Sequence, residues 1–91
     1  MTAVFAGWID GLKDRAGRAR ILVRIDRLAH GNPGQHRNLT GGVSELKIDF
    51  GPGYRVYYTT RGKELIILLA GGEKSTQQRD IKNAVRLASN L

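Results

Sequence analysis

The 91 residues carry 15 Lys and Arg against 8 Asp and Glu, a formal net charge of +7, and their 41% hydrophobic content suffices for one small domain, residues 1–91. With no cysteine and two histidines, the chain lacks the residues for a disulfide scaffold, a thiol nucleophile or a metal site built on Cys or His, and we expect no metal and no cofactor. No membrane-length apolar run and no signal-peptide pattern occur, so we expect a cytoplasmic protein whose positive charge favours polyanions, above all nucleic acid, or an acidic protein.

Two N-terminal segments place apolar residues at helical spacing. In the first segment these residues are Phe5, Trp8, Ile9 and Leu12. In the second they are Ile21, Leu22, Ile25, Leu28 and Ala29. The first helix is expected to end near Lys13, and Asp14 is the expected N-cap of the second. Gly31 and Pro33 are expected to end the second helix. Because the connection between the first and the second helix is short, we predict that the two form an antiparallel helical hairpin.

The next part of the chain predicts a sheet. Residues 31–42 are rich in turn residues and are expected to form a loop. Apolar and polar residues then alternate in 44–50 and in 54–59, around the turn Gly51–Gly53. The unbroken apolar run 65–69 predicts an interior strand covered on both faces. Three consecutive strands with short turns form an antiparallel meander.

The C-terminal part predicts a third helix. Ser75 and Gln78 have the spacing of a capping box, and the apolar residues that follow continue at helical spacing to about Asn90. The complete prediction is an α+β fold, in which a twisted antiparallel sheet of about three to four strands packs on the helical hairpin, with a C-terminal helix.

The register of the first hairpin decides which residues share a face of the sheet. A three-residue turn at 51–53 places Phe50 opposite Tyr54, Lys47 opposite Tyr57, and Asp49 opposite Arg55. The apolar residues of both strands then fall on one face, and a slip by one residue would mix core and surface. The other face collects polar residues, namely Glu45, Lys47, Asp49, Arg55 and Tyr57. Lys74, after a flexible Gly71–Gly72, is expected to reach this polar face.

The segments taken together resemble a known family. They include Phe5-x-x-Trp8-Ile9-x-x-Leu12, Gly31-Asn32-Pro33-Gly34, Gly42-Val43-Ser44-Glu45-Leu46-Lys47-Ile48, Gly51-Pro52-Gly53-Tyr54-Arg55-Val56-Tyr57-Tyr58 and Leu68-Leu69-Ala70-Gly71-Gly72-Glu73-Lys74. In this order they resemble the RelE/ParE superfamily of bacterial toxins, and most closely its HigB-like addiction module killer branch, which is related to phage-derived Gp49-like proteins.

The resemblance implies a toxin neutralised by a cognate antitoxin, typically a helix-turn-helix protein. It implies a ribosome-dependent endonuclease that cuts mRNA without a metal and so inhibits translation. Two alternatives remain: a ParE-like poison of DNA gyrase, and an inactive module that only binds the antitoxin. Members of the family normally open with a β-strand, which has no counterpart before Phe5. Either this strand is missing, or the sequence starts downstream of the natural start. A missing strand would expose a sheet edge.

The family chemistry needs a base for the 2′-OH, stabilisation of the phosphate charge and an acid for the leaving oxygen. Arg55 matches the phosphate-contacting arginine of the family, and its planar fork suits phosphate oxygens. Lys47 and Lys74 match basic positions that stabilise the transition state. The base stays open among Glu45, Lys47 and Tyr57, because no histidine follows His36 and no tyrosine follows Tyr58. The basic residues expected to contact RNA are Arg18, Arg24 and Arg37.

Overall fold

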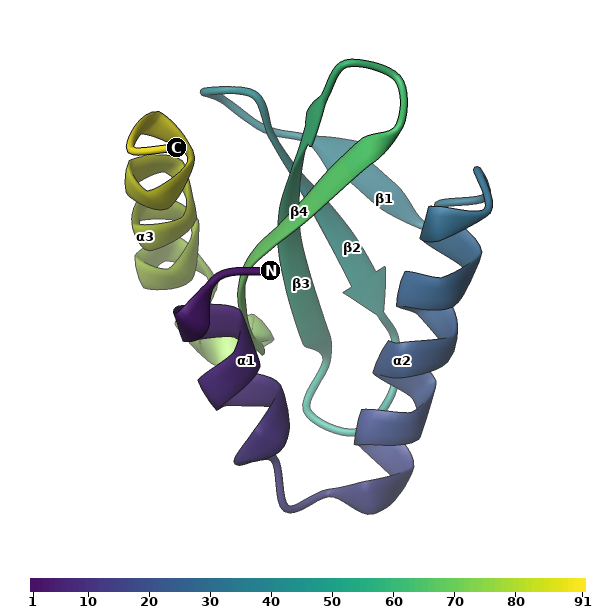
Figure 1. Cartoon of the computed structure of the whole chain (residues 1–91). Coiled ribbons are helices and arrows are strands. Elements are labelled where there is room, and N and C mark those ends of the chain that lie inside the picture. The colour runs from purple at the N-terminus through teal and green to yellow at the C-terminus, as the bar shows by residue number, and fades with distance from the viewer.

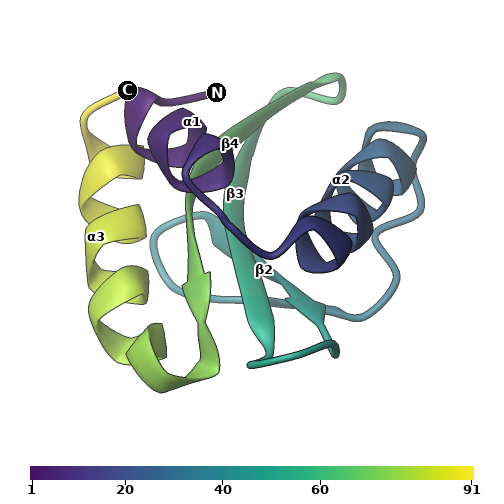
Figure 2. The ribbon, with the colours of Figure 1, turned by 90° about the horizontal axis from the view of Figure 1, so that it is seen from below.

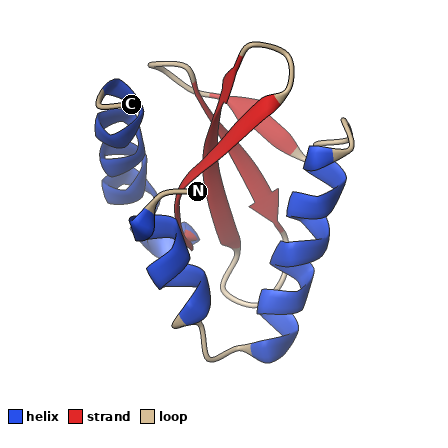
Figure 3. Ribbon diagram, viewed as in Figure 1, coloured by secondary structure: helices blue, strands red, loops and turns tan.

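The computed structural model describes all residues 1–91 as three α-helices and a four-stranded antiparallel sheet, which confirms the α+β prediction (Figures 1 and 3). The strands lie side by side in chain order, so the meander is also confirmed. The elements are α1 (Ala3–Asp10), α2 (Arg15–Ala29), β1 (His36–Asn38), β2 (Val43–Ile48), β3 (Tyr54–Arg61), β4 (Leu65–Glu73), the 3₁₀ turn η1 (Lys74–Thr76) and α3 (Gln77–Ser89).

Helices cover both faces of the sheet (Figure 2). On one face, α1 lies against β4 and α2 lies against β2 and β3, so each helix of the predicted hairpin packs on the sheet. On the other face, α3 packs on β4 and β3. The core on the α1 and α2 face contains Phe5, Ile9, Ile21, Leu28, Leu46, Ile48, Tyr54, Val56 and Tyr58. The core under α3 contains Val43, Tyr57, Leu69, Ala70 and Ala84.

The ends of the first two helices follow local hydrogen bonding. Asp14 caps α2 as predicted, because its Oδ1 accepts a hydrogen bond from the Gly17 N–H at 2.9 Å. The expected end of the first helix near Lys13 is wrong, since α1 stops at Asp10 with Gly11 as its C-cap. Leu22, expected on the core face of α2, is an exposed residue.

The predicted register of the first hairpin is wrong by two residues. Ile48 pairs with Tyr54, Leu46 with Val56, and Lys47 with Arg55, so Lys47 does not face Tyr57. The connection spans five residues, 49–53, and leaves Asp49 outside the sheet. Because a shift of two conserves the alternation, the polar and apolar faces are nevertheless the predicted ones.

Three further expectations need correction. The segment 31–42 is not all loop, since it contains the short edge strand β1. The apolar run 65–69 belongs to β4, which is the other edge strand and not an interior one, although helices cover both of its faces. Near its start, the chain also reaches this edge, where the Thr2 N–H donates to the Leu68 carbonyl at 3.0 Å. The predicted capping box of Ser75 and Gln78 is formed instead by Glu73 and Thr76.

Gly71 and Gly72 form part of β4 and are packed on both sides, which contradicts the expected flexible connection. A Cβ on Gly71 would lie within 2.5 Å of three ring carbons of Trp8, whose indole rests on the strand. A Cβ on Gly72 would meet the carboxylate of Asp80 on the opposite face. These glycines therefore let α1 and α3 approach β4 closely, and they hold the start of η1 in a defined place.

Candidate functional site

A polar pocket of about 390 Å³ opens on the α3 side of the sheet, where β1, β2, β3 and η1 meet. None of the residues that line it is hydrophobic. It brings together five of the eight predicted site residues, and four cations line it against one carboxylate. We call this surface the polar pocket, and its lining residues are Gln35, His36, Arg37, Glu45, Lys47, Arg55, Lys74 and Gln77.

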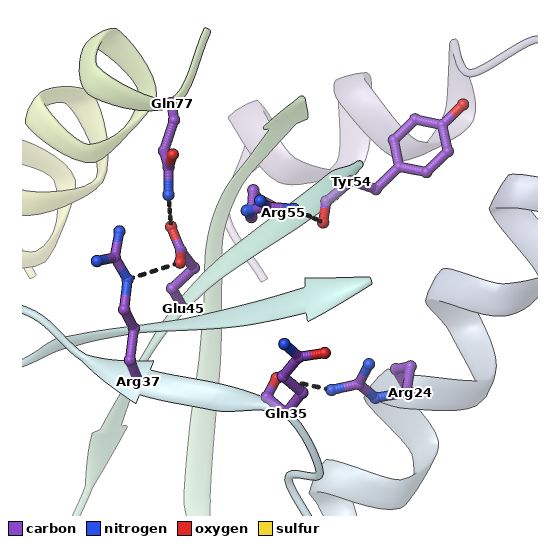
Figure 4. Close-up of polar contacts among 7 residues, drawn as sticks. All are labelled: Arg24, Gln35, Arg37, Glu45, Tyr54, Arg55 and Gln77. Carbon is purple, nitrogen blue, oxygen red and sulfur yellow. Dashed lines mark hydrogen bonds and ion pairs between the residues drawn. The ribbon is translucent and has the colours of Figure 1, made fainter. Parts of the chain in front are cut away.

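Glu45 lies at the back of the polar pocket with only 2% of its surface exposed. Its Oε1 accepts a hydrogen bond from Arg37 Nε at 2.8 Å, and its Oε2 accepts one from Gln77 Nε2 at 2.8 Å (Figure 4). The hydrogen bond with Glu45 raises the pKa of Arg37. Because both oxygens of Glu45 already bind side chains of β1 and α3, its carboxylate serves to position these two residues and is not free to accept a proton from a substrate.

Arg55 is 3% exposed and has no acidic partner within 4 Å. Its Nη1 donates to the Tyr54 carbonyl at 3.1 Å, whereas its buried Nε has no hydrogen-bond partner (Figure 4). A buried guanidinium without a counter-charge costs stability. Arg55 also lies directly across from Lys47, and like charges in this position destabilise a sheet. Local conflicts of this kind are typical of sites that bind a ligand.

Lys47 and Lys74 enter the polar pocket from two separate elements. Lys47 is half-buried on β2. Lys74 begins η1, and its backbone N–H donates to the Gly53 carbonyl at 2.8 Å, which fixes the turn against the β2–β3 connection. Lys74 therefore lines the same pocket as Lys47 and Arg55, as expected. The segment that carries it there is packed and not flexible.

Tyr57 lies beneath the polar pocket and is fully buried. Burial first, and then the nearby carboxylates of Glu45 and Asp80, raise its pKa far above the usual range. Its hydroxyl has no hydrogen-bond partner. Since it neither reaches solvent nor ionises readily, Tyr57 does not fit the role of base that the sequence left open for it.

The three basic residues expected to contact RNA occupy different surroundings. Arg37 lines the polar pocket. Arg18 is exposed on α2 and lies 3.8 Å from Asp10. Arg24 binds three backbone carbonyls, those of Pro33, Gln35 and Lys47, at 2.7–3.0 Å. Its guanidinium therefore holds the loop before β1 onto α2, which is a structural role.

Three lining residues of the polar pocket are not among the predicted site residues, namely Gln35, His36 and Gln77. Gln35 comes two residues before Arg37, so the alternation of an extended chain places both on one side, but this segment read as loop. Gln77 reaches Glu45 across 32 residues of sequence, and no local pattern indicates that contact.

Two classes of structural feature do not occur in the chain. No three His, Asp or Glu side chains gather in an arrangement that could hold a metal ion. No helix is long and apolar enough to cross a membrane.

Comparisons with known proteins give two matches. The family model described as "Phage derived protein Gp49-like (DUF891)" matches residues 7–91. An uncharacterized protein of Haemophilus influenzae is 47% identical over 90 residues, which cover 99% of this chain and 91% of that protein. No solved structure shows a significant match.

Proposed function

Because the chain belongs to the family of phage-derived Gp49-like proteins, we propose that it is the toxin of a bacterial toxin–antitoxin pair and cleaves mRNA on the ribosome. The observation that carries the proposal is Arg55, a buried guanidinium without a counter-charge in a pocket that also holds Lys47 and Lys74. A phosphodiester supplies the negative charge that this arrangement lacks.

The proposed reaction is attack of the ribose 2′-OH on the adjacent phosphorus, with breakage of the bond to the 5′ oxygen. The 2′-OH proton passes to a base, and the leaving oxygen takes up a proton, so that a cyclic phosphate and a 5′-hydroxyl result. Arg55 binds the phosphate oxygens and holds them while charge accumulates. Lys47 and Lys74 stabilise the same charge from two sides of the polar pocket.

The geometry leaves Lys47 and His36, which both line the polar pocket, as the candidate proton acceptors of this proposal. Glu45 is bonded to Arg37 and Gln77, and Tyr57 is buried with a raised pKa, so neither meets the geometric requirement for a base. The same proposal places the protein in the cytoplasm, where it acts on the ribosome and is neutralised by a cognate antitoxin.

The test uses primer extension on mRNA from cells that express the chain. We expect discrete cuts within translated reading frames together with growth arrest. Arg55→Gln abolishes both, whereas Arg61→Gln, an arginine exposed at the far end of the same strand, retains them. Growth arrest with intact mRNA overturns the nuclease, and protein-linked DNA breaks then identify a gyrase poison. Normal growth on expression of the folded chain overturns the toxin and leaves a binding module.

A further inference from the structure

A second concave surface lies on the opposite face of the sheet from the polar pocket, between α2 and the end of β2. Its volume is about 310 Å³, and half of its lining residues are hydrophobic. We call it the α2 groove. Its apolar residues are Ala19, Val23, Ile48 and Phe50, and its charged residues are Arg20, Arg24, Arg27 and Asp49.

The apolar part of the α2 groove is open to solvent. Val23 is 50% exposed, and its neighbour Leu22 is 44% exposed. One face of the Phe50 ring is covered by the guanidinium of Arg20, 4.4 Å from the ring centre. Adjacent exposed apolar side chains framed by charged ones are typical of protein-binding surfaces.

The charge of the α2 groove is unbalanced. Neither Arg20 nor Arg27 has a carboxylate within 4 Å. Arg24 between them is held by backbone carbonyls, and burial together with the like charge of Arg27 lowers its pKa. A partner with carboxylates above Arg20 and Arg27 would relieve this repulsion.

The spacing of these residues describes the partner. Arg20, Val23 and Arg27 stand at positions i, i+3 and i+7, so α2 presents an apolar side chain between two cations about 10 Å apart along its axis. We propose that the α2 groove binds an amphipathic helix of a partner protein, with apolar side chains on Val23 and Phe50 and acidic side chains on Arg20 and Arg27.

A nucleic acid fits this surface less well than an acidic helix. A phosphate backbone could pair with the arginines, but it offers no apolar group to pack on the apolar residues of the α2 groove. The inference holds whether or not the polar pocket cleaves RNA, and a helix in the α2 groove leaves the polar pocket on the other face open.

The probe is a synthetic 18-residue helical peptide with Glu at i and i+7 and Leu at i+3 and i+4, titrated into the ¹⁵N-labelled chain. We expect chemical-shift changes confined to α2 and residues 48–50. Val23→Asp weakens binding about tenfold or more. Val4→Asp, at an equally exposed valine of α1 (51%), leaves binding unchanged. Circular dichroism verifies that both variants remain folded.

Two further probes decide the chemistry of the partner. The same peptide with Lys in place of Glu, and the same peptide with Gln in place of Leu, are both expected to bind at least tenfold more weakly. The proposal is overturned if the Lys peptide binds as well as the Glu peptide, if no shifts occur in the α2 groove, or if Val4→Asp and Val23→Asp weaken binding equally. It is also overturned if a ten-nucleotide single-stranded RNA shifts the α2 groove residues and displaces the peptide.

Discussion

Replacing Gly71 by Ala tests whether the close approach of α1 to β4 holds the fold together. The added methyl group would lie 2.1 Å from Trp8 Cε3 and 2.2 Å from Cζ3, whereas ordinary contacts between carbon atoms are about 3.5–4.0 Å. The indole is a rigid, half-buried ring that packs against Phe5 and Tyr54. It cannot yield as the end of a flexible side chain would, so α1 or the strand has to move.

Overpacking of this kind costs about 1–3 kcal/mol. For a chain of this size, we expect Gly71→Ala to lower the melting temperature by about 5–20 °C. Gly7→Ala is the matched control, because a Cβ on Gly7 in α1 meets no atom within 4 Å. It removes a glycine from a helix interior and is expected to stabilise the chain by about 0.5–1 kcal/mol.

The measurement is urea denaturation followed by circular dichroism, combined with a double-mutant cycle. In a Trp8→Leu background the clash is absent, so Gly71→Ala is expected to cost at least about 1 kcal/mol less than in the wild type. If Gly71→Ala leaves stability unchanged, or costs the same with and without Trp8, then the packing of the indole on the strand is not what requires glycine.

The remaining predictions concern the polar pocket, the tyrosines and the first helix. Arg55→Gln removes a buried charge that has no counter-ion. The free energy of unfolding in urea is expected to stay equal or to rise by about 1–2 kcal/mol, and binding of single-stranded RNA is expected to be lost. A large loss of stability would contradict this prediction. Burial is the main cause, and the hydrogen bond to Asp14 the second, that raises the pKa of Tyr54 to about 12. Burial also raises the pKa of Tyr57 and of Tyr58. Since these folded-state values exceed the unfolded value near 10, the contribution to stability is complete below pH 10 and is lost as pH rises through about 12; tyrosinate absorbance at 295 nm that appears with a midpoint at pH 10 in the folded chain would refute the shifts. Thr2 caps α1 and bonds the β4 backbone, so Thr2→Ala is expected to cost about 1–2 kcal/mol by thermal denaturation, and an unchanged melting temperature would contradict that role.

The alternation of residues predicted both faces of the sheet but not the register between its strands. Leu46 and Val56 face α1 and α2, and Glu45 and Arg55 face the other side, as the pattern indicated. A shift by two residues conserves every face, so the pattern could not distinguish a three-residue connection from a five-residue one. That choice depends on how the chain turns between β2 and β3, where Gly51 and Gly53 both adopt positive φ.

The sequence could predict in part which residues come together in the polar pocket. Glu45, Lys47 and Arg55 lie on one face by alternation, and Lys74 follows closely enough in sequence to reach them. Gln35 and Gln77 could not be placed, because one lies in a segment that resembles loop and the other comes from a helix that packs across the sheet. The loss of Glu45 and Tyr57 as candidate bases has the same origin, since both are buried by elements distant in sequence.

The sequence by itself determined the three helices, the strands β2, β3 and β4, the polarity of each sheet face and the excess of positive charge, because these follow from local periodicity and composition. Only the tertiary structure decided which polar residues are exposed and which charges are paired. Packing of α3 on the sheet buries Tyr57 and clamps Glu45, while it leaves Arg55 without a counter-charge. Burial and pairing depend on contacts between distant segments, which no local pattern contains.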